Sequence, residues 1–146
     1  LVAAMGAVPP HLAERFAATE LHRLLGLELL EARPGYARIA LRTGPATLSG
    51  VGGAVHGGVL AAMVDIAMLF ALQASLQPGD VPNGTADLGI TYLRPVHGAR
   101  AEAEAHIVRK GRTLAYAEVA ITDEQGNLCA RGRTLYALRQ APPAPA

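Results

Sequence analysis

Asp65 is the only formally charged side chain between Arg42 and Asp80. It interrupts residues 59–72, which are otherwise apolar. Burying a carboxylate is costly, because desolvation disfavours its charged form. A chain keeps such a group either for a structural role, such as a pairing with arginine or a backbone N–H, or for proton chemistry. The residues alone leave both explanations open for Asp65.

His56-Gly57-Gly58 directly precedes this apolar run and predicts the start of a helix. Two glycines allow a ligand to approach the unpaired N–H groups of a first helical turn. A carbonyl oxygen bound there would accept hydrogen bonds at the positive end of the helix dipole. His56 has a plainer explanation, because a histidine at a helix start is often only a cap or a packing residue.

The glycine-rich segment around this point does not fit a nucleotide-binding loop. A dinucleotide fingerprint that begins at Gly50 requires glycine at position 55, which is Val55, and no βαβ pattern surrounds it. The chain also has no Gly-Lys-Ser/Thr sequence. We therefore expect no nucleotide cofactor.

Other patterns of catalysis or metal binding are weak. Ser49 and Ser75 lack the Gly-x-Ser-x-Gly spacing of a nucleophile elbow. Cys129, the only cysteine, lies within a predicted strand and has no adjacent base. We expect no metal site, because the remaining histidines lack the spacing of metal ligands; they are His11, His22, His97 and His106.

Positive charge gathers in the second half of the chain. Lys110-Gly111-Arg112 is typical of a solvated turn, and Arg94 precedes a proline. Arg131 and Arg133 alternate along a predicted strand. Side chains of these types hold phosphates when several converge in space. The sequence does not establish that they converge.

Composition narrows the class of protein. The 146 residues carry a formal net charge of +1 and no tryptophan, which argues against nucleic acid or a membrane surface as a partner. Hydrophobic residues make up 51% of the chain and charged residues 17%, so we expect a homo-oligomer with apolar interfaces. A single cysteine allows no internal disulfide and suits a reducing cytoplasm.

Membrane insertion is not expected. The apolar run is shorter than the roughly 20 residues that span a bilayer. Residues 1–8 are mildly apolar but have no basic residues ahead of them, so we do not expect a signal peptide.

The pattern along the chain predicts one domain, residues 1–140, and a disordered Pro/Ala-rich tail at 141–146. A partial apolar stripe predicts a helix at about residues 11–25. A long apolar helix starts near Gly57 and ends before Pro78. Alternation and turn signals predict strands at 27–32, 36–42, 85–93, 101–108, 113–122 and 128–138. Consecutive hairpins imply an antiparallel sheet, and a curved sheet can wrap an apolar helix.

His56-Gly57-Gly58 followed by Asp65 in an apolar helix resembles the hotdog-fold acyl-CoA thioesterases of the phenylacetate-pathway (PaaI-like) type. Residues 85–95, Thr-Ala-Asp-Leu-Gly-Ile-Thr-Tyr-Leu-Arg-Pro, resemble the family's strand after the helix. Residues 110–115, Lys-Gly-Arg-Thr-Leu-Ala, resemble a later turn. The motifs occur in the family's order, and the resemblance covers most of the chain from residue 25 to residue 138.

The resemblance implies an α+β hotdog fold, in which a curved antiparallel sheet wraps one long helix, here with an extra N-terminal helix. It also implies a dimer with one continuous sheet, often paired into a tetramer, and active sites between subunits. The implied reaction is hydrolysis of an acyl-CoA thioester to a free carboxylic acid and CoA. No cofactor is implied, because CoA is part of the substrate.

The resemblance also implies roles for particular residues. The Gly57 N–H would polarise the thioester carbonyl, and Asp65 would act as general base or as nucleophile. Thr85 would position the water or the acid, and His56 would support the loop or touch the thioester. The residues implied to bind the substrate or its CoA are Gly58, Arg94, Lys110, Gly111 and Arg112.

Gly57 and Asp65 are too far apart to act on one carbonyl within one chain. Eight residues separate them, which is about 12 Å of helix at 1.5 Å per residue. We therefore expect Asp65 to work with Gly57 of a neighbouring subunit, and a monomer to be inactive.

Gly50 departs from the family's pattern, because many members carry Asn or Gln there to orient water or substrate. Ser49 could replace that side chain only if the loop shifts by one residue. The alternative function is therefore a non-catalytic acyl-CoA-binding hotdog protein. A dehydratase that acts on a hydroxyacyl thioester ranks lower, because His56 and Asp65 do not have the arrangement expected for dehydration.

Overall fold

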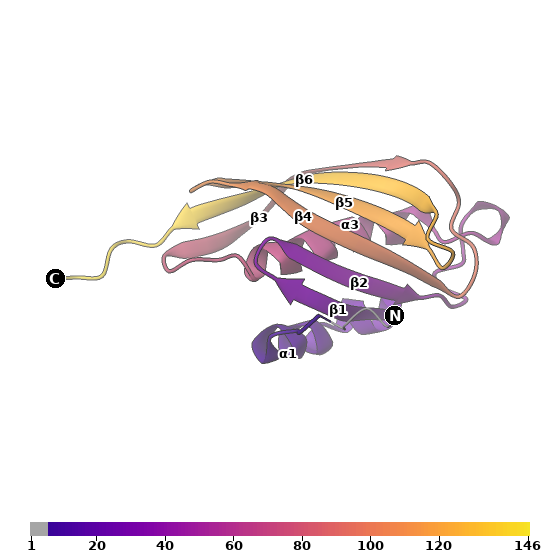
Figure 1. Ribbon diagram of the computed structural model, residues 1–146, viewed down its shortest axis with the longest axis horizontal. Helices are drawn as coiled ribbons and strands as arrows, with labels where there is room; N and C mark the ends of the chain where they lie inside the picture. Colours follow the sequence, from indigo (N-terminus) through magenta and orange to yellow (C-terminus); the bar gives the residue numbers. More distant parts are fainter. Residues whose placement is uncertain (1–5) are drawn as a thin grey trace.

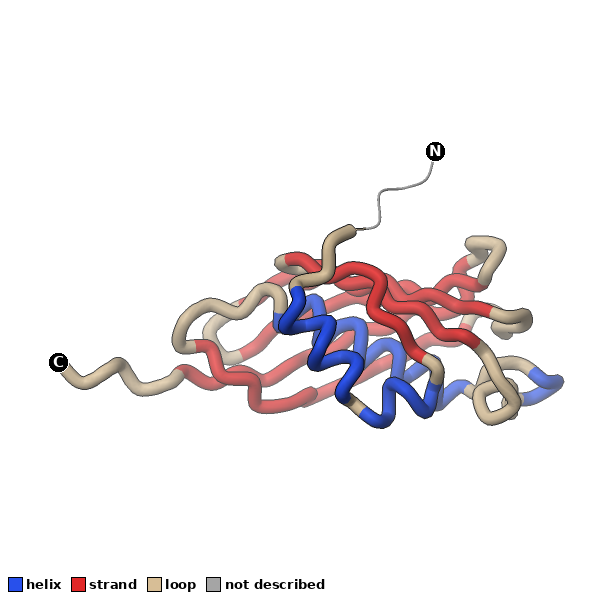
Figure 2. The backbone as a smooth tube through the Cα atoms, turned by 90° about the horizontal axis from the view of Figure 1, so that it is seen from below, coloured by secondary structure: helices blue, strands red, loops and turns tan. Residues whose placement is uncertain are grey.

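The computed structural model describes residues 6–146. Its helices are α1 (Pro10–Ala18), α2 (Glu20–Leu25) and α3 (Gly57–Gln73), with a short 3-10 turn at Val51–Gly53. Its strands are β1 (Leu27–Arg33), β2 (Tyr36–Arg42), β3 (Asp80–Tyr92), β4 (Arg100–Lys110), β5 (Leu114–Asp123) and β6 (Leu128–Gln140). All six strands form one antiparallel sheet in the order β1-β2-β4-β5-β6-β3, and α3 lies along one face of it (Figures 1 and 2). The predicted α+β hotdog fold is confirmed.

The core lies between α3 and the inward face of the sheet. The inward positions of β4 and β5 are largely alanines that are at most 2% exposed: Ala101, Ala103, Ala105, Ala115 and Ala117. These small side chains let the sheet lie close to a helix that is apolar on every side. The sheet lies tight against α3 at Gly132 of β6, where an added Cβ would lie 2.5 Å from Cγ1 of Val64. The sheet therefore holds α3 rigidly, together with the residues that project from it.

The single N-terminal helix predicted at residues 11–25 is wrong, because the segment forms two helices. The chain breaks at Thr19, whose backbone is extended at φ −79° and ψ 113°. Its hydroxyl donates a hydrogen bond to the carbonyl of Arg15 at 2.9 Å. A β-branched residue loses side-chain freedom in a helix, and its hydroxyl competes for backbone groups. Both effects favour a break at this residue.

The break also changes which side chains of α2 face the core. His22 is 6% exposed, and its ring packs against Phe16 and Phe70. Leu21 and Leu24, which are expected on the apolar stripe, are 51% and 71% exposed. The predicted stripe assumes one continuous helix. The extended residue Thr19 rotates α2 relative to α1, so different side chains of α2 face the core.

β3 is longer than predicted and lies at an edge of the sheet. It begins at Asp80 rather than at Thr85, and within residues 6–146 it pairs with β6 alone. An edge strand tolerates Pro82, because one side of the strand needs no N–H donor. The hairpin signals did not reveal that the first strand after α3 lies beside the last strand of the chain. The other strands begin and end within two residues of their predicted limits.

The two ends of the chain add little to the fold. Residues 141–146 form no helix or strand and extend away from the sheet (Figure 1). Their disorder stays a prediction, as does the cytoplasmic location. The expectation that residues 1–8 are not a signal peptide falls largely on residues 1–5, which lie outside the described residues. Within residues 6–146, no helix has both the length and the apolar character needed to span a membrane.

Candidate active site

Asp65 reaches from α3 to the edge strand β3. The Thr85 hydroxyl donates a hydrogen bond to Oδ1 of Asp65 at 2.6 Å, so the structure brings these two predicted residues together. The Asp65 side chain is partly buried, and within residues 6–146 no lysine or arginine forms an ion pair with it. The structural alternative, a pairing with arginine, is therefore not supported. A hydroxyl donor orients the carboxylate without neutralising its charge.

Tyr136 adds a second polar neighbour. It pairs across the strands with Thr85 and is 7% exposed. Burial, and secondly the negative charge of Asp65, raise the pKa of Tyr136. The phenol therefore stays protonated near the carboxylate.

The start of α3 leaves one glycine N–H open. His56 is the N-cap residue, and its Nδ1 accepts a hydrogen bond from the Gly58 N–H at 2.9 Å. Its plainer explanation as a cap is thus confirmed. The Gly57 N–H has no acceptor within residues 6–146. Of the two glycine donors that the sequence indicated, only Gly57 is available to a ligand.

The preceding loop explains the departure from the family's pattern at Gly50. Its N–H donates to the carbonyl of Ala54 at 2.9 Å, and an added Cβ would lie 2.7 Å from that same oxygen. Asn or Gln would therefore force the backbone to move. Ser49 does not take over this role, because its hydroxyl donates to the carbonyl of Ala46 at 2.8 Å.

Tyr92 is a site residue that the sequence patterns did not single out. It lies at the end of β3, and its hydroxyl donates a hydrogen bond to the Gly57 carbonyl at 2.7 Å. The alternation of Leu88, Ile90 and Tyr92 along the strand could have placed its ring on the face toward α3. The contact with Gly57 has no sequence signal, because 35 residues separate the two.

A pocket of about 410 Å³ opens beside the start of α3. Gly50 and Gly57 border it, and most of its side chains are apolar. They come from the loop before α3, from α3, from the last residue of β3 and from the segment that follows it, and include Val55, Leu60, Tyr92, Leu93 and Val96. The open donor of Gly57 therefore lies at the wall of an apolar pocket.

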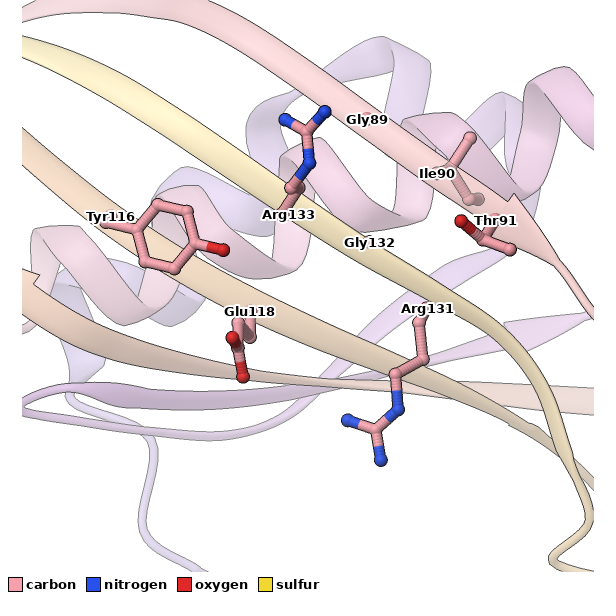
Figure 3. A pocket seen from close by; sticks show the side chains of 8 residues that line it. All are labelled: Gly89, Ile90, Thr91, Tyr116, Glu118, Arg131, Gly132 and Arg133. Atoms are coloured by element: carbon pink, nitrogen blue, oxygen red, sulfur yellow. The ribbon is translucent and has the colours of Figure 1, made fainter.

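A second pocket, of about 390 Å³, lies on the other face of the sheet (Figure 3). Arg131 and Arg133 of β6 and Tyr116 of β5 point away from α3 there, and Arg133 pairs with Asp87 at 2.9 Å. The sheet separates this pocket from Asp65. The alternating arginines of β6 are thus not part of the candidate site of one chain.

The basic residues that the resemblance implied do not converge within one chain. Lys110 forms an ion pair with Asp80 and holds the pKa of that carboxyl well below its usual range. Arg94 lies beyond the other end of β3, 14 residues from Asp80, which is about 46 Å of extended chain at 3.3 Å per residue. Gly111 and Arg112 lie in the β4–β5 turn, and within residues 6–146 Arg112 forms no ion pair.

The remaining candidate groups do not form a site. Burial raises the pKa of the Cys129 thiol, which disfavours the thiolate that a nucleophile requires. In the part of the chain that the structure describes, no group of three or more His, Cys, Asp or Glu side chains is placed to hold a metal ion.

Comparisons with known proteins point to one family. The family model described as Thioesterase superfamily matches residues 52–130, which include Gly57 and Asp65. Acyl-coenzyme A thioesterase 13 of Homo sapiens is 31% identical over 119 residues, or 80% of this chain and 83% of that protein. Medium/long-chain acyl-CoA thioesterase YigI of Escherichia coli is 29% identical over 117 residues, or 71% and 76% of the two chains. A mutant of phenylacetic acid degradation protein PaaI from Thermus thermophilus has a TM-score of 0.72 and 28% identity, and the match covers 82% of this chain and 98% of that one.

Proposed function

The chain belongs to the thioesterase superfamily, and from this membership we propose that it hydrolyses an acyl-CoA thioester to a free carboxylic acid and CoA. The observation that carries the proposal is the contact between Thr85 and Asp65. It orients a carboxylate that has no cationic partner within residues 6–146, at the same edge of the sheet as the open Gly57 donor. A non-catalytic acyl-CoA-binding protein is less favoured, because the relatives are named as thioesterases.

The complete site, in this proposal, forms between two subunits joined along β3. This strand is 13 residues long, and one of its edges pairs with no strand of the same chain within residues 6–146. A long open edge invites association with another strand. Antiparallel pairing with the same strand of a second copy satisfies that edge and has the twofold symmetry that is commonest among homodimers.

The contacts on β3 suggest the register of this pairing. Thr85 is the β3 residue that contacts Asp65, and Tyr92 is the β3 residue that contacts Gly57. Pairing Thr85 with the partner subunit's Tyr92 puts the twofold axis between Leu88 and Gly89. Asp65 of one subunit then lies beside Gly57 of the other, which overcomes their separation of about 12 Å within one helix.

The chemistry follows from these two groups. The Gly57 N–H of one subunit donates to the thioester carbonyl oxygen, and the partner subunit's Asp65 takes a proton from the attacking water. The oxyanion that forms stays bound to the Gly57 N–H. When the C–S bond breaks, the protonated carboxyl returns its proton to the CoA thiolate. Direct attack by Asp65, followed by hydrolysis of the mixed anhydride, is the alternative mechanism.

The same register divides the substrate between the two subunits. The apolar pocket beside Gly57 takes the acyl group. In this register Arg94 lies beside the start of the partner's β3. The partner's β4–β5 turn, which contains the partner subunit's Arg112, is next to that end of the strand. Both guanidinium groups can contact the phosphates of the CoA nucleotide. Lys110 has a weaker claim to this role, because its ammonium is paired with Asp80.

The activity is tested by thiol release over a panel of aliphatic and aromatic acyl-CoA thioesters, with binding measured by calorimetry in parallel. We expect at least one thioester to release free CoA with turnover. Binding without thiol release across the whole panel would instead identify an acyl-CoA-binding protein.

Thr85 gives the proposal a graded test. Thr85→Val keeps the shape of the side chain and removes the donor to Asp65, so we expect kcat to fall about tenfold, the usual worth of a hydrogen bond to a charged group. Thr85→Ser keeps the hydroxyl and should retain most of the activity. Steady-state kinetics and melting temperatures of both variants check this. Equal kcat values for the Val and Ser variants would remove Thr85 from the site.

A further inference from the structure

We propose that Tyr92 is a positioning residue for the Gly57 donor, an inference that rests on the proposed thioester hydrolysis. The side chains of Tyr92 and His56 both bond the peptide group between Gly57 and Gly58, which is the first peptide group within α3. The Tyr92 hydroxyl donates to its carbonyl, Gly57 O, at 2.7 Å. Its N–H, which belongs to Gly58, donates to Nδ1 of His56 at 2.9 Å. With both ends bonded, this peptide plane has a fixed orientation.

The peptide on the other side of Gly57 carries the donor itself. Its carbonyl, His56 O, accepts hydrogen bonds from the N–H groups of Val59 at 2.9 Å and Leu60 at 3.3 Å. Bonds at the carbonyl end polarise the N–H at the other end of the same peptide. The Gly57 N–H is therefore oriented by the helix on one side and by Tyr92 and His56 on the other.

Two successive glycines make this external support necessary. Glycine has the greatest backbone freedom of any residue, and a helix end frays readily. A side chain at position 57 would restrict that freedom, but it would press against the Tyr92 ring, which would have to shift by a few tenths of an ångström. An added Cβ would lie 3.1 Å from the Tyr92 hydroxyl oxygen and 3.2 Å from its Cζ. Gly57 and Tyr92 therefore form a matched pair, in which the tyrosine supplies from β3 the restraint that glycine lacks.

The position of Tyr92 in the fold adds a second consequence. It is the last residue of β3, the strand proposed to form the subunit interface. Its hydrogen bond links Gly57, which provides the donor, to β3, the strand proposed to pair with the partner subunit. A tyrosine here thus fixes the distance from the Gly57 N–H to the partner subunit's Asp65, rather than only the local shape of the loop. Tyr92 is 52% exposed and also lines the apolar pocket.

Tyr92→Phe tests the inference, because it removes only the hydroxyl and keeps the ring against Gly57. We expect kcat to fall about tenfold, less than the 10²- to 10³-fold typical of deleting an oxyanion donor. KM should be nearly unchanged, because the pocket wall remains. Hydrogen exchange of the Gly58 amide, followed by NMR, should be faster in the variant. Tyr116→Phe, a matched change on the opposite face of the sheet, should alter neither quantity.

Three results would overturn the inference: an unchanged kcat, unchanged exchange at Gly58, or a rise in KM without a fall in kcat. The last would make Tyr92 a substrate contact only. Failure of the proposed function is distinguishable from these results, because the wild-type protein would then release no thiol from any acyl-CoA. The exchange measurement would still decide in that case whether Tyr92 holds the helix start.

Discussion

Asp65→Asn is expected to lower kcat by about 10²- to 10⁴-fold, the range that general acid–base catalysis contributes. The amide has the shape of the carboxylate and its oxygen still accepts from Thr85, but it neither takes a proton from water nor attacks a carbonyl. The fold should survive, because the replaced group is partly buried and pairs with no cation within residues 6–146. Removing an ionised group from a partly apolar site should leave the melting temperature equal or higher.

Thiol-release kinetics and thermal melting of purified Asp65→Asn measure both parts of this prediction. Glu118→Gln is the matched control, because it removes a carboxylate from the opposite face of the sheet. A variant with near-normal kcat would exclude Asp65 as base and as nucleophile. A single turnover of the wild-type protein in ¹⁸O-labelled water tests for nucleophilic attack, because label enters the Asp65 side chain only when water opens a mixed anhydride at the aspartyl carbonyl.

Gly57→Pro is expected to lower kcat by about 10²- to 10³-fold, the cost of removing one donor from an oxyanion site. Proline has no N–H, so the substitution deletes the group proposed to polarise the carbonyl. The backbone is suited to it, because proline is favoured at the first position of a helix. The residue before it, His56, already has the extended conformation that precedes proline, at φ −59° and ψ 132°.

Gly57→Ala is the matched control for this prediction. Alanine adds a Cβ close to the Tyr92 ring, as proline does, but it keeps the N–H. Because that ring is half exposed and has room to move, we expect the alanine variant to lose much less activity than the proline variant. Steady-state kinetics of the two proteins, with circular dichroism to confirm the helix, check the difference. Equal losses would show that crowding at Tyr92, and not the donor, explains the importance of Gly57.

The parts of the molecule that could be predicted are those with local signals. α3 was evident from its uninterrupted apolar run, and Asp65 stood out because that run has no other charge. The strands showed alternation and turn residues, so all of their limits except the start of β3 were predicted to within two residues. The hydroxyl of Thr85 was expected near Asp65 only through the family resemblance, and the structure brings the two together.

The parts that could not be predicted depend on packing between distant segments. The break at Thr19 puts His22 against Phe70 of α3, a contact that the stripe of one continuous helix does not predict. The place of β3 at the sheet edge is set by its pairing with β6, and local alternation cannot choose that partner. Tyr92 became a candidate only when this pairing carried it to the start of α3. Whether the lysine and arginine residues expected at the CoA nucleotide lie together also depends on the topology. The topology puts Lys110 and Arg94 at opposite ends of β3.

The central claim, that Asp65 of one subunit works with Gly57 of another, is tested most directly by combining two inactive chains. Asp65→Asn and Gly57→Pro are co-expressed with different affinity tags, and the mixed oligomer is purified through both tags. Each mixed dimer has one site with two intact groups and one site with none, so we predict about half of the wild-type kcat per dimer from this symmetry. A mixed oligomer as inactive as its two parents would show that the groups do not act across the interface, and would contradict the account.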